Sequence, residues 1–183
     1  MTDLVLAAKD DRLKTGRTGV RWRPAWKWPP ETERFVAEIL ADCPRPILHV
    51  CAGSSPLGDV KADMFHPAAD VRADMYRLPF RDGSFGTVVA DPPFPLDGVS
   101  LPQRLAQFQE MGRVARRGGV VLLHAPWLPS PTWGDLEGFW FRETSGHAFP
   151  MAPVIMSKWR VVGDRAARDL EAARRGNLDK DGA

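Results

Sequence analysis

The sequence predicts an α/β fold with a single, mostly parallel sheet that is flanked by helices. Three observations indicate this class. Short runs rich in β-branched and apolar residues alternate with segments of helical periodicity. The short runs are apolar at consecutive positions, which is typical of strands covered on both faces. The length of 183 residues, with 44% hydrophobic and 26% charged residues, fits one globular domain.

Residues 1–30 differ from the rest of the chain and are predicted to form a basic, tryptophan-rich N-terminal arm. They hold seven Lys or Arg against three Asp, and their prolines discourage regular structure. Trp22, Trp26 and Trp28 alternate with basic residues such as Arg23. Two interpretations stay open. In the first, these four side chains bind nucleic acid by stacking on bases and contacting phosphates. In the second, the tryptophans pack on the domain and the arginines face water.

The elements of the main domain, residues 31–163, follow in order. Apolar residues at helical spacing after Pro29-Pro30 predict a helix over 31–42. Four strands are then expected, at 47–51, 61–65, 72–76 and in the run FGTVVA that ends at Asp91. The connection between the first two is too short for a helical crossover, which takes a dozen or more residues. The first crossover helix is therefore expected to be abbreviated or missing, or the strand assignment to be wrong.

The second half of the domain continues the alternation. Ser100 and Gln103 form a capping box for a helix, and the run ARRGG is expected to end it. Buried strands are predicted at 120–125, around Phe139–Phe141 and at 154–162. Residues 164–183 are expected to be a surface helix followed by a tail.

Cysteine, histidine and hydropathy patterns exclude several classes. Cys43 and Cys51 form no metal-binding motif, and the four histidines are scattered without ligand spacing, so no metal site is expected. No apolar stretch approaches the roughly 18 residues of a membrane span, and no cleavable leader is evident. We expect a cytoplasmic protein that has no membrane partner.

Unusual residues gather where the predicted strands end. Ligands of open parallel sheets bind at the carboxyl ends of the strands. The four strands end in Cys51-Ala52-Gly53-Ser54-Ser55, near Asp63, near Asp74, and in Asp91-Pro92-Pro93-Phe94. Four such endings along one edge predict a pocket there.

Residues 45–125 resemble the Rossmann-like (class I) S-adenosylmethionine-dependent methyltransferases. The most specific stretch is VRADMYRLPFRDGSFGTVVADPPF, at 71–94. Its last four residues, DPPF, resemble the motif of the amino-methylating branch, whose members modify exocyclic amino groups of adenine, cytosine or guanine. The resemblance implies a Rossmann-like sheet and S-adenosylmethionine as the cofactor.

The resemblance also implies cofactor-binding roles. Gly53 lets the backbone approach the amino-acid part of the cofactor, and Cys51, Ala52, Ser54 and Ser55 line its methionine end. Asp63 is expected to accept hydrogen bonds from the ribose hydroxyls. Asp74 is expected to accept one from the adenine amino group, with Met75 packing on the ring. In the family an acidic residue stands at the position of Cys51, and glycines stand at those of Ser55 and Leu57. Because the spacing from Gly53 to Asp63 is also short, the ribose role is left open between Asp63, Asp70 and Asp74.

The DPPF loop is expected to carry out catalysis. The Asp91 carboxylate and the Pro92 carbonyl accept the two hydrogens of an amino group, which orients the nitrogen lone pair towards the methyl group. Pro92 and Pro93 hold this backbone rigid, and Phe94 stacks on the target base. His147 is expected to line the target pocket.

The resulting hypothesis is methyl transfer to an exocyclic amino nitrogen of a nucleic-acid base, with DNA adenine first and RNA close behind. A base within a duplex must be flipped out for this chemistry. One alternative is a methyltransferase for a small molecule or for a protein amine or amide. Another is a non-catalytic subunit that retains the fold. A partner chain or a homodimer stays open.

Overall fold

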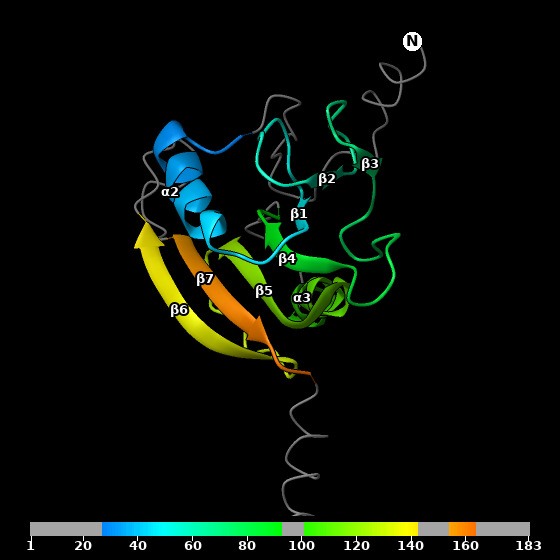
Figure 1. Ribbon diagram of the computed structural model, residues 1–183, viewed down its shortest axis with the longest axis vertical. Helices are drawn as coiled ribbons and strands as arrows, with labels where there is room; N and C mark the ends of the chain where they lie inside the picture. The colour runs from blue at the N-terminus through cyan, green and yellow to red at the C-terminus, as the bar shows by residue number, and fades with distance from the viewer. Residues whose placement is uncertain (1–26, 93–100, 143–153, 164–183) are drawn as a thin grey trace, which may run out of the picture.

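A computed structural model describes residues 27–92, 101–142 and 154–163. Its seven strands form one sheet in the order β3-β2-β1-β4-β5-β7-β6 (Figure 1). Strands β1 to β5 pair in parallel, and β7 runs antiparallel to both β5 and β6. The predicted α/β class with a mostly parallel sheet is confirmed. The strands are β1 Ile47–Val50, β2 Val60–Asp63, β3 Val71–Arg72, β4 Phe85–Ala90, β5 Ala115–Ala125, β6 Gly134–Arg142 and β7 Val154–Val161.

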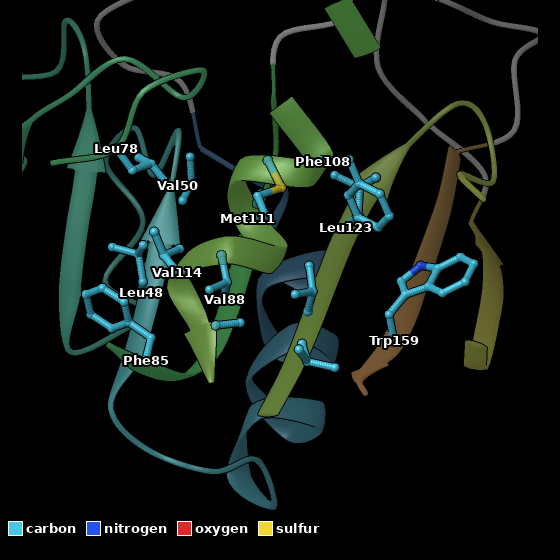
Figure 2. Close-up of a cluster of buried hydrophobic side chains, with 14 of the residues drawn as sticks. Leu48, Val50, Leu78, Phe85, Val88, Phe108, Met111, Val114, Leu123 and Trp159 are labelled. Carbon is cyan, nitrogen blue, oxygen red and sulfur yellow. The ribbon is translucent and has the colours of Figure 1, made fainter. Parts of the chain in front are cut away.

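Two helices cover opposite faces of the sheet. Helix α2, Pro30–Ala41, begins at the proline pair, and α3, Leu101–Val114, precedes β5. Consecutive residues of β4 point to different faces of the sheet. Val88 packs in the buried cluster that includes Met111 of α3, here called the α3 cluster. Val89 packs in the cluster that includes Val36 of α2, the α2 cluster. Figure 2 draws the α3 cluster, in which buried apolar side chains of the helix meet those of β1, β4, β5 and β7. Each face of the central strands is thus closed by one helix.

The chain passes from β1 to β2 without a helix. Leu48 pairs with Val60 across the parallel strands, and the connecting residues 51–59 run back along β1. Asp59 holds this path, since its N–H donates to the Ile47 carbonyl at 2.8 Å and its carboxylate accepts the Ile47 N–H at 2.7 Å. Gly58 has a φ of 99°, and a Cβ there would lie 3.0 Å from the Cβ of His49. The expected loss of the first crossover helix is confirmed.

Some predicted boundaries are wrong. The second and third strands were expected at 61–65 and 72–76, but β2 ends at Asp63 and β3 has only two residues. The run ARRGG, expected to end a helix, lies at the start of β5. A Cβ on Gly119 would lie 2.6 Å from the carbonyl oxygen of Gly86 on β4. This glycine therefore permits a close approach of two strands.

Arg113, near the end of α3, ties the turn before β4 to the helix. Its guanidinium donates to Asp82 and to Glu110, each at 2.6 Å, and to the carbonyls of Leu78 and Phe80. Glu110 in turn accepts the Leu78 N–H at 2.7 Å. The Leu-Pro-Phe and Asp-Gly segments are therefore held in place by one cation, directly before the strand that leads to Asp91.

The expected role of Trp28 in binding nucleic acid is corrected. Its side chain is 2% exposed and stacks on the imidazole of His49, with ring centroids 4.9 Å apart. A ring buried in this way is not available to a base, so the alternative interpretation, packing on the domain, holds for Trp28. The other expected substrate contacts of the arm, Trp22, Arg23 and Trp26, lie outside the described residues.

Candidate functional site

Three carboxylates surround the end of β1. The pKa of the Cys51 thiol is raised well above its ordinary value, first by burial and then by the charges of Asp63, Asp91 and Asp74. These aspartates follow β2, β4 and β3, and Cys51 follows β1. The structure therefore brings together the endings of all four strands that the sequence placed at one edge. Three negative charges therefore act on the Cys51 thiol.

The loop after β1 is tightly turned and largely buried. Cys51 and Gly53 both have left-handed backbone conformations, with φ of 57° and 54°. Ala52, Gly53 and Ser55 are buried, whereas Ser54 is exposed. The Ser55 N–H donates to the Ala52 carbonyl at 3.0 Å, which closes the turn. The loop thus presents backbone and small side chains at the carboxyl edge of the sheet.

Asp63 holds two loops together. One carboxylate oxygen accepts the Gly53 N–H at 3.0 Å, and the other accepts the N–H groups of Phe65 and His66 at 2.8 and 2.9 Å. A carboxylate offers about four acceptor positions, so these three donors occupy most of its capacity. Asp63 is only 6% exposed. It anchors the Gly53 loop, and about one acceptor position remains beyond these three bonds.

Asp74 and Met75 lie past the carboxyl end of β3 and are half-buried. Asp74 accepts the Tyr76 N–H at 2.9 Å. The Cys51 thiol donates to the Met75 sulfur at 3.6 Å, so Met75 lies directly beside the β1 loop. Asp70, by contrast, precedes β3, is exposed and accepts the Lys61 N–H at 2.7 Å. Of the two acidic residues near β3, Asp74 is the one at the carboxyl edge.

Asp91 is paired with His124 of β5, a residue to which the sequence analysis assigned no role. The Nδ1–H of His124 donates to Oδ1 of Asp91 at 2.8 Å. A carboxylate only accepts, so Nδ1 carries the hydrogen. Asp91 is 5% and His124 8% exposed. In the pairing register of β4 and β5, Ala90 lies opposite Leu123, so the residues that follow them, Asp91 and His124, are neighbours. This register is the feature that identifies the pair. Pro92 is buried beside it.

A layer of rings lies behind this pair. Trp28 contacts His124 edge-on, with centroids 5.9 Å apart, and stacks on His49. The Nδ1–H of His49 donates to the Leu57 carbonyl at 3.1 Å. Burial lowers the pKa of His49 from 6.5 to about 4, so this imidazole is neutral at physiological pH. Trp28 and His124 thus join the residues before α2 to the end of β4.

An open hollow of about 320 Å³ is lined in part by Trp28. Its cations are Lys27 and Arg34, and its remaining lining comes from α2 and from Leu57 in the β1–β2 loop. Neither Asp91 nor His124 lines this hollow.

The last predictions to compare with the structure concern three further site residues, a metal site and a membrane span. Pro93, Phe94 and His147 lie outside the described residues. Within the described ranges, no group of three or more His, Cys, Asp or Glu side chains could hold a metal ion. No helix in the part of the chain that the structure describes is long and apolar enough to cross a membrane.

Comparison with known proteins identifies the fold. No protein-family model matches the chain, and no curated protein matches it. Among solved structures, the N-methyltransferase NodS from Bradyrhizobium japonicum WM9 is similar with a TM-score of 0.53 and 12% identity, over 72% of this chain and 95% of NodS. The chain has the class I methyltransferase fold.

A second solved structure agrees with this class I fold. It belongs to a study of the conversion of a disulfide bond into a thioacetal group during echinomycin biosynthesis. It matches with a TM-score of 0.50 and 14% identity, over 84% of this chain and 94% of that one. At such low identities the likeness concerns the fold alone.

Proposed function

We propose that the protein is an S-adenosylmethionine-dependent methyltransferase that binds its cofactor at the carboxyl edge of β1 to β4. The observation that carries this proposal is the convergence of Asp63, Asp74 and Asp91 on Cys51, in a chain with the class I fold. When bound, S-adenosylmethionine supplies an electrophilic methyl group on a positively charged sulfur. Three carboxylates at this edge favour a cation, so the chemistry of these side chains fits the cofactor.

The residues of the edge fit different parts of the cofactor. The backbone at Gly53, with Cys51, Ala52, Ser54 and Ser55, forms the side for the amino-acid end. Asp74 is the accessible carboxylate for the adenine amino group, and Met75 supplies an apolar surface for the ring. Asp63 has about one acceptor position beyond its three backbone bonds, which suits one ribose hydroxyl.

The acceptor substrate in this proposal is an exocyclic amino group of a nucleic-acid base, with DNA adenine first and RNA next. The lone pair of such a nitrogen is delocalised into the ring, so its hydrogens need acceptors that direct the lone pair at the methyl group. Asp91 supplies a carboxylate whose orientation is set by His124, and the Pro92 carbonyl supplies a second acceptor. Phe94, the last residue of DPPF, stacks on the base. Trp22, Arg23, Trp26 and His147 provide further substrate contacts.

A small-molecule amine, or a protein amine or amide, is the second candidate substrate. The burial of Trp28 favours it, because one of the three arm tryptophans is not available to a base.

Calorimetric titration with S-adenosylmethionine and S-adenosylhomocysteine tests the cofactor site. We expect micromolar binding of both, weakened by Asp74→Asn. Asp70→Asn is the matched control, since Asp70 also accepts one backbone N–H near β3 but lies at the other end of the strand. A loss of binding in Asp70→Asn alone would move the ribose or adenine contact to Asp70. No binding by the wild type would contradict the cofactor proposal.

Transfer of a labelled methyl group tests the substrate. Single-stranded and duplex DNA, RNA and a panel of small amines are compared at several salt concentrations. A nucleic-acid substrate predicts a steep loss of affinity with salt, and a smaller slope after Arg23→Gln. A flat salt response with turnover of small amines would favour the second candidate. Asp91→Asn is expected to abolish transfer to every acceptor.

A further inference from the structure

We infer that His124 is a positioning residue, which orients the Asp91 carboxylate for the amino group of the substrate through Nδ1–H. This inference rests on the proposed function. Neither the DPPF motif nor the class I fold gives His124 a role, and the inference assigns it one.

The first support is geometry. The Nδ1–H of His124 donates to Asp91 Oδ1 at 2.8 Å, and both side chains are at least nine-tenths buried. A carboxylate attached to a strand end can rotate about its side-chain bonds unless a partner holds it. The buried hydrogen bond restricts that rotation, so the plane of the carboxylate is set before the substrate binds.

The second support is that the imidazole itself is held in place. Trp28 lies edge-on to His124 with centroids 5.9 Å apart, and Trp28 is in turn stacked on His49. Strand β5 is a central strand between β4 and β7, which fixes the backbone of His124. The ring therefore has packing on its edge and a hydrogen bond on Nδ1, and both keep it directed at Asp91.

The third support is the charge around the carboxylate. Titratable side chains that interact with Asp91 from neighbouring strands include His49 and Cys51 on the β1 side and His124 on β5. Burial keeps His49 neutral and raises the pKa of the Cys51 thiol, so neither offers Asp91 a charged partner. Of these three, His124 is the one with a hydrogen bond to the carboxylate.

The chemical consequence concerns the orientation of the nucleophile. When bound, S-adenosylmethionine would supply the methyl group and keep the electrons of the broken C–S bond as a neutral thioether, so the substrate nitrogen would need only a lone pair directed at that methyl group. The proton that the nitrogen then loses passes to the Asp91 carboxylate and on to solvent. His124 keeps its own proton on Nδ1 throughout. An amide in its place that donates from the same position would do the same work.

The test compares two substitutions at one position in the full-length protein. His124→Leu removes the donor, and His124→Asn keeps an N–H near the place of Nδ1 but has no basic nitrogen. We expect His124→Leu to lower kcat by about 10²-fold, the scale of a misplaced catalytic group, with little change in the Kd of S-adenosylmethionine. His124→Asn is expected to recover most of this loss.

Thermal melting and cofactor calorimetry on each variant separate misfolding from a catalytic effect. A control substitution, Phe141→Ala, changes an aromatic side chain of β6 that is 66% exposed and is expected to leave kcat near the wild-type value. Wild-type kcat in His124→Leu would overturn the inference. Equal losses in the Leu and Asn variants, both folded, would also overturn it, because the imidazole would then act as a base. A wild type that transfers no methyl group to any acceptor contradicts the proposed function itself.

Discussion

The indole of Trp28 lies stacked on the imidazole of His49, with ring centroids 4.9 Å apart and planes inclined by 23°. This contact joins the segment before the first described helix to β1, and it closes the sheet on the face that α2 covers. Trp28 is therefore part of the core.

Trp28→Ala is expected to destabilise the protein by about 3 to 5 kcal/mol, because it removes a buried indole and leaves a cavity between α2 and the sheet. Urea unfolding followed by fluorescence or circular dichroism measures the change. Phe141→Ala, at an aromatic side chain that is 66% exposed, is the control and should change stability by less than about 0.5 kcal/mol. Equal effects of the two substitutions would contradict a buried position for Trp28.

His49 predicts a loss of stability in mild acid. Its pKa is about 4 in the folded protein and 6.5 in the unfolded chain, so the unfolded state binds the proton first as pH falls below 6.5. Between pH 7 and pH 5 this lowers the free energy of unfolding by about 2 kcal/mol, and the loss levels off below about pH 4.

His49→Phe removes the titrating group and keeps a ring against Trp28. The difference in unfolding free energy between pH 7 and pH 5, measured in urea, should therefore shrink in this variant by the same about 2 kcal/mol. An unchanged pH dependence would show that other groups cause it.

Arg113→Met is expected to cost about 2 kcal/mol. The substitution leaves the carbonyls of Leu78 and Phe80 and the Glu110 carboxylate without their shared donor, and the side chain is partly exposed, which moderates the loss. Arg116→Met, at an exposed arginine three residues along, is the matched control. Chemical unfolding of both variants is the measurement, and a similar small effect in each would contradict the anchoring role of Arg113.

Gly112→Ala is expected to destabilise the protein despite the better helix propensity of alanine. The added Cβ would lie 2.3 Å from Trp133 Cε2, so α3 or the indole must shift. The gain of about 1 kcal/mol from propensity is outweighed by overpacking of about 1 to 3 kcal/mol. A fall of a few degrees in Tm is expected, whereas Gln109→Ala on the exposed side of α3 should not lower it. A higher Tm for Gly112→Ala would show that the indole moves at little cost.

The sequence predicts the central strands and α2 well because their signals are local. Apolar runs bounded by proline and glycine mark β1 and β4, and Pro29-Pro30 marks the start of α2. The start of β5 is missed for the opposite reason: two glycines after basic residues are typical of a helix end, yet Gly119 is needed for its approach to Gly86. The burial of Trp28 is similarly decided by tertiary packing and not by its proline-rich surroundings.

The candidate site also has a part that the sequence predicts and a part that only the folded structure shows. Asp63, Asp74 and Asp91 are found by their position after strands. The pair of Asp91 and His124 is separated by many residues and needs the pairing register of β4 and β5, which the sequence does not show. The occupation of Asp63 by three backbone donors is also a property of the folded loops alone.

The short connection between β1 and β2 also has a kinetic consequence. Leu48 pairs with Val60 only twelve positions away, whereas it pairs with Val88 of β4 forty positions away. Closing the shorter loop costs about 1 kcal/mol less conformational entropy. Parallel strands ordinarily pair late in folding because their contacts are distant in sequence. In this chain the β1–β2 pair, with Asp59 bonded to Ile47, is a local unit that can form early and offer an edge on which β4 then adds.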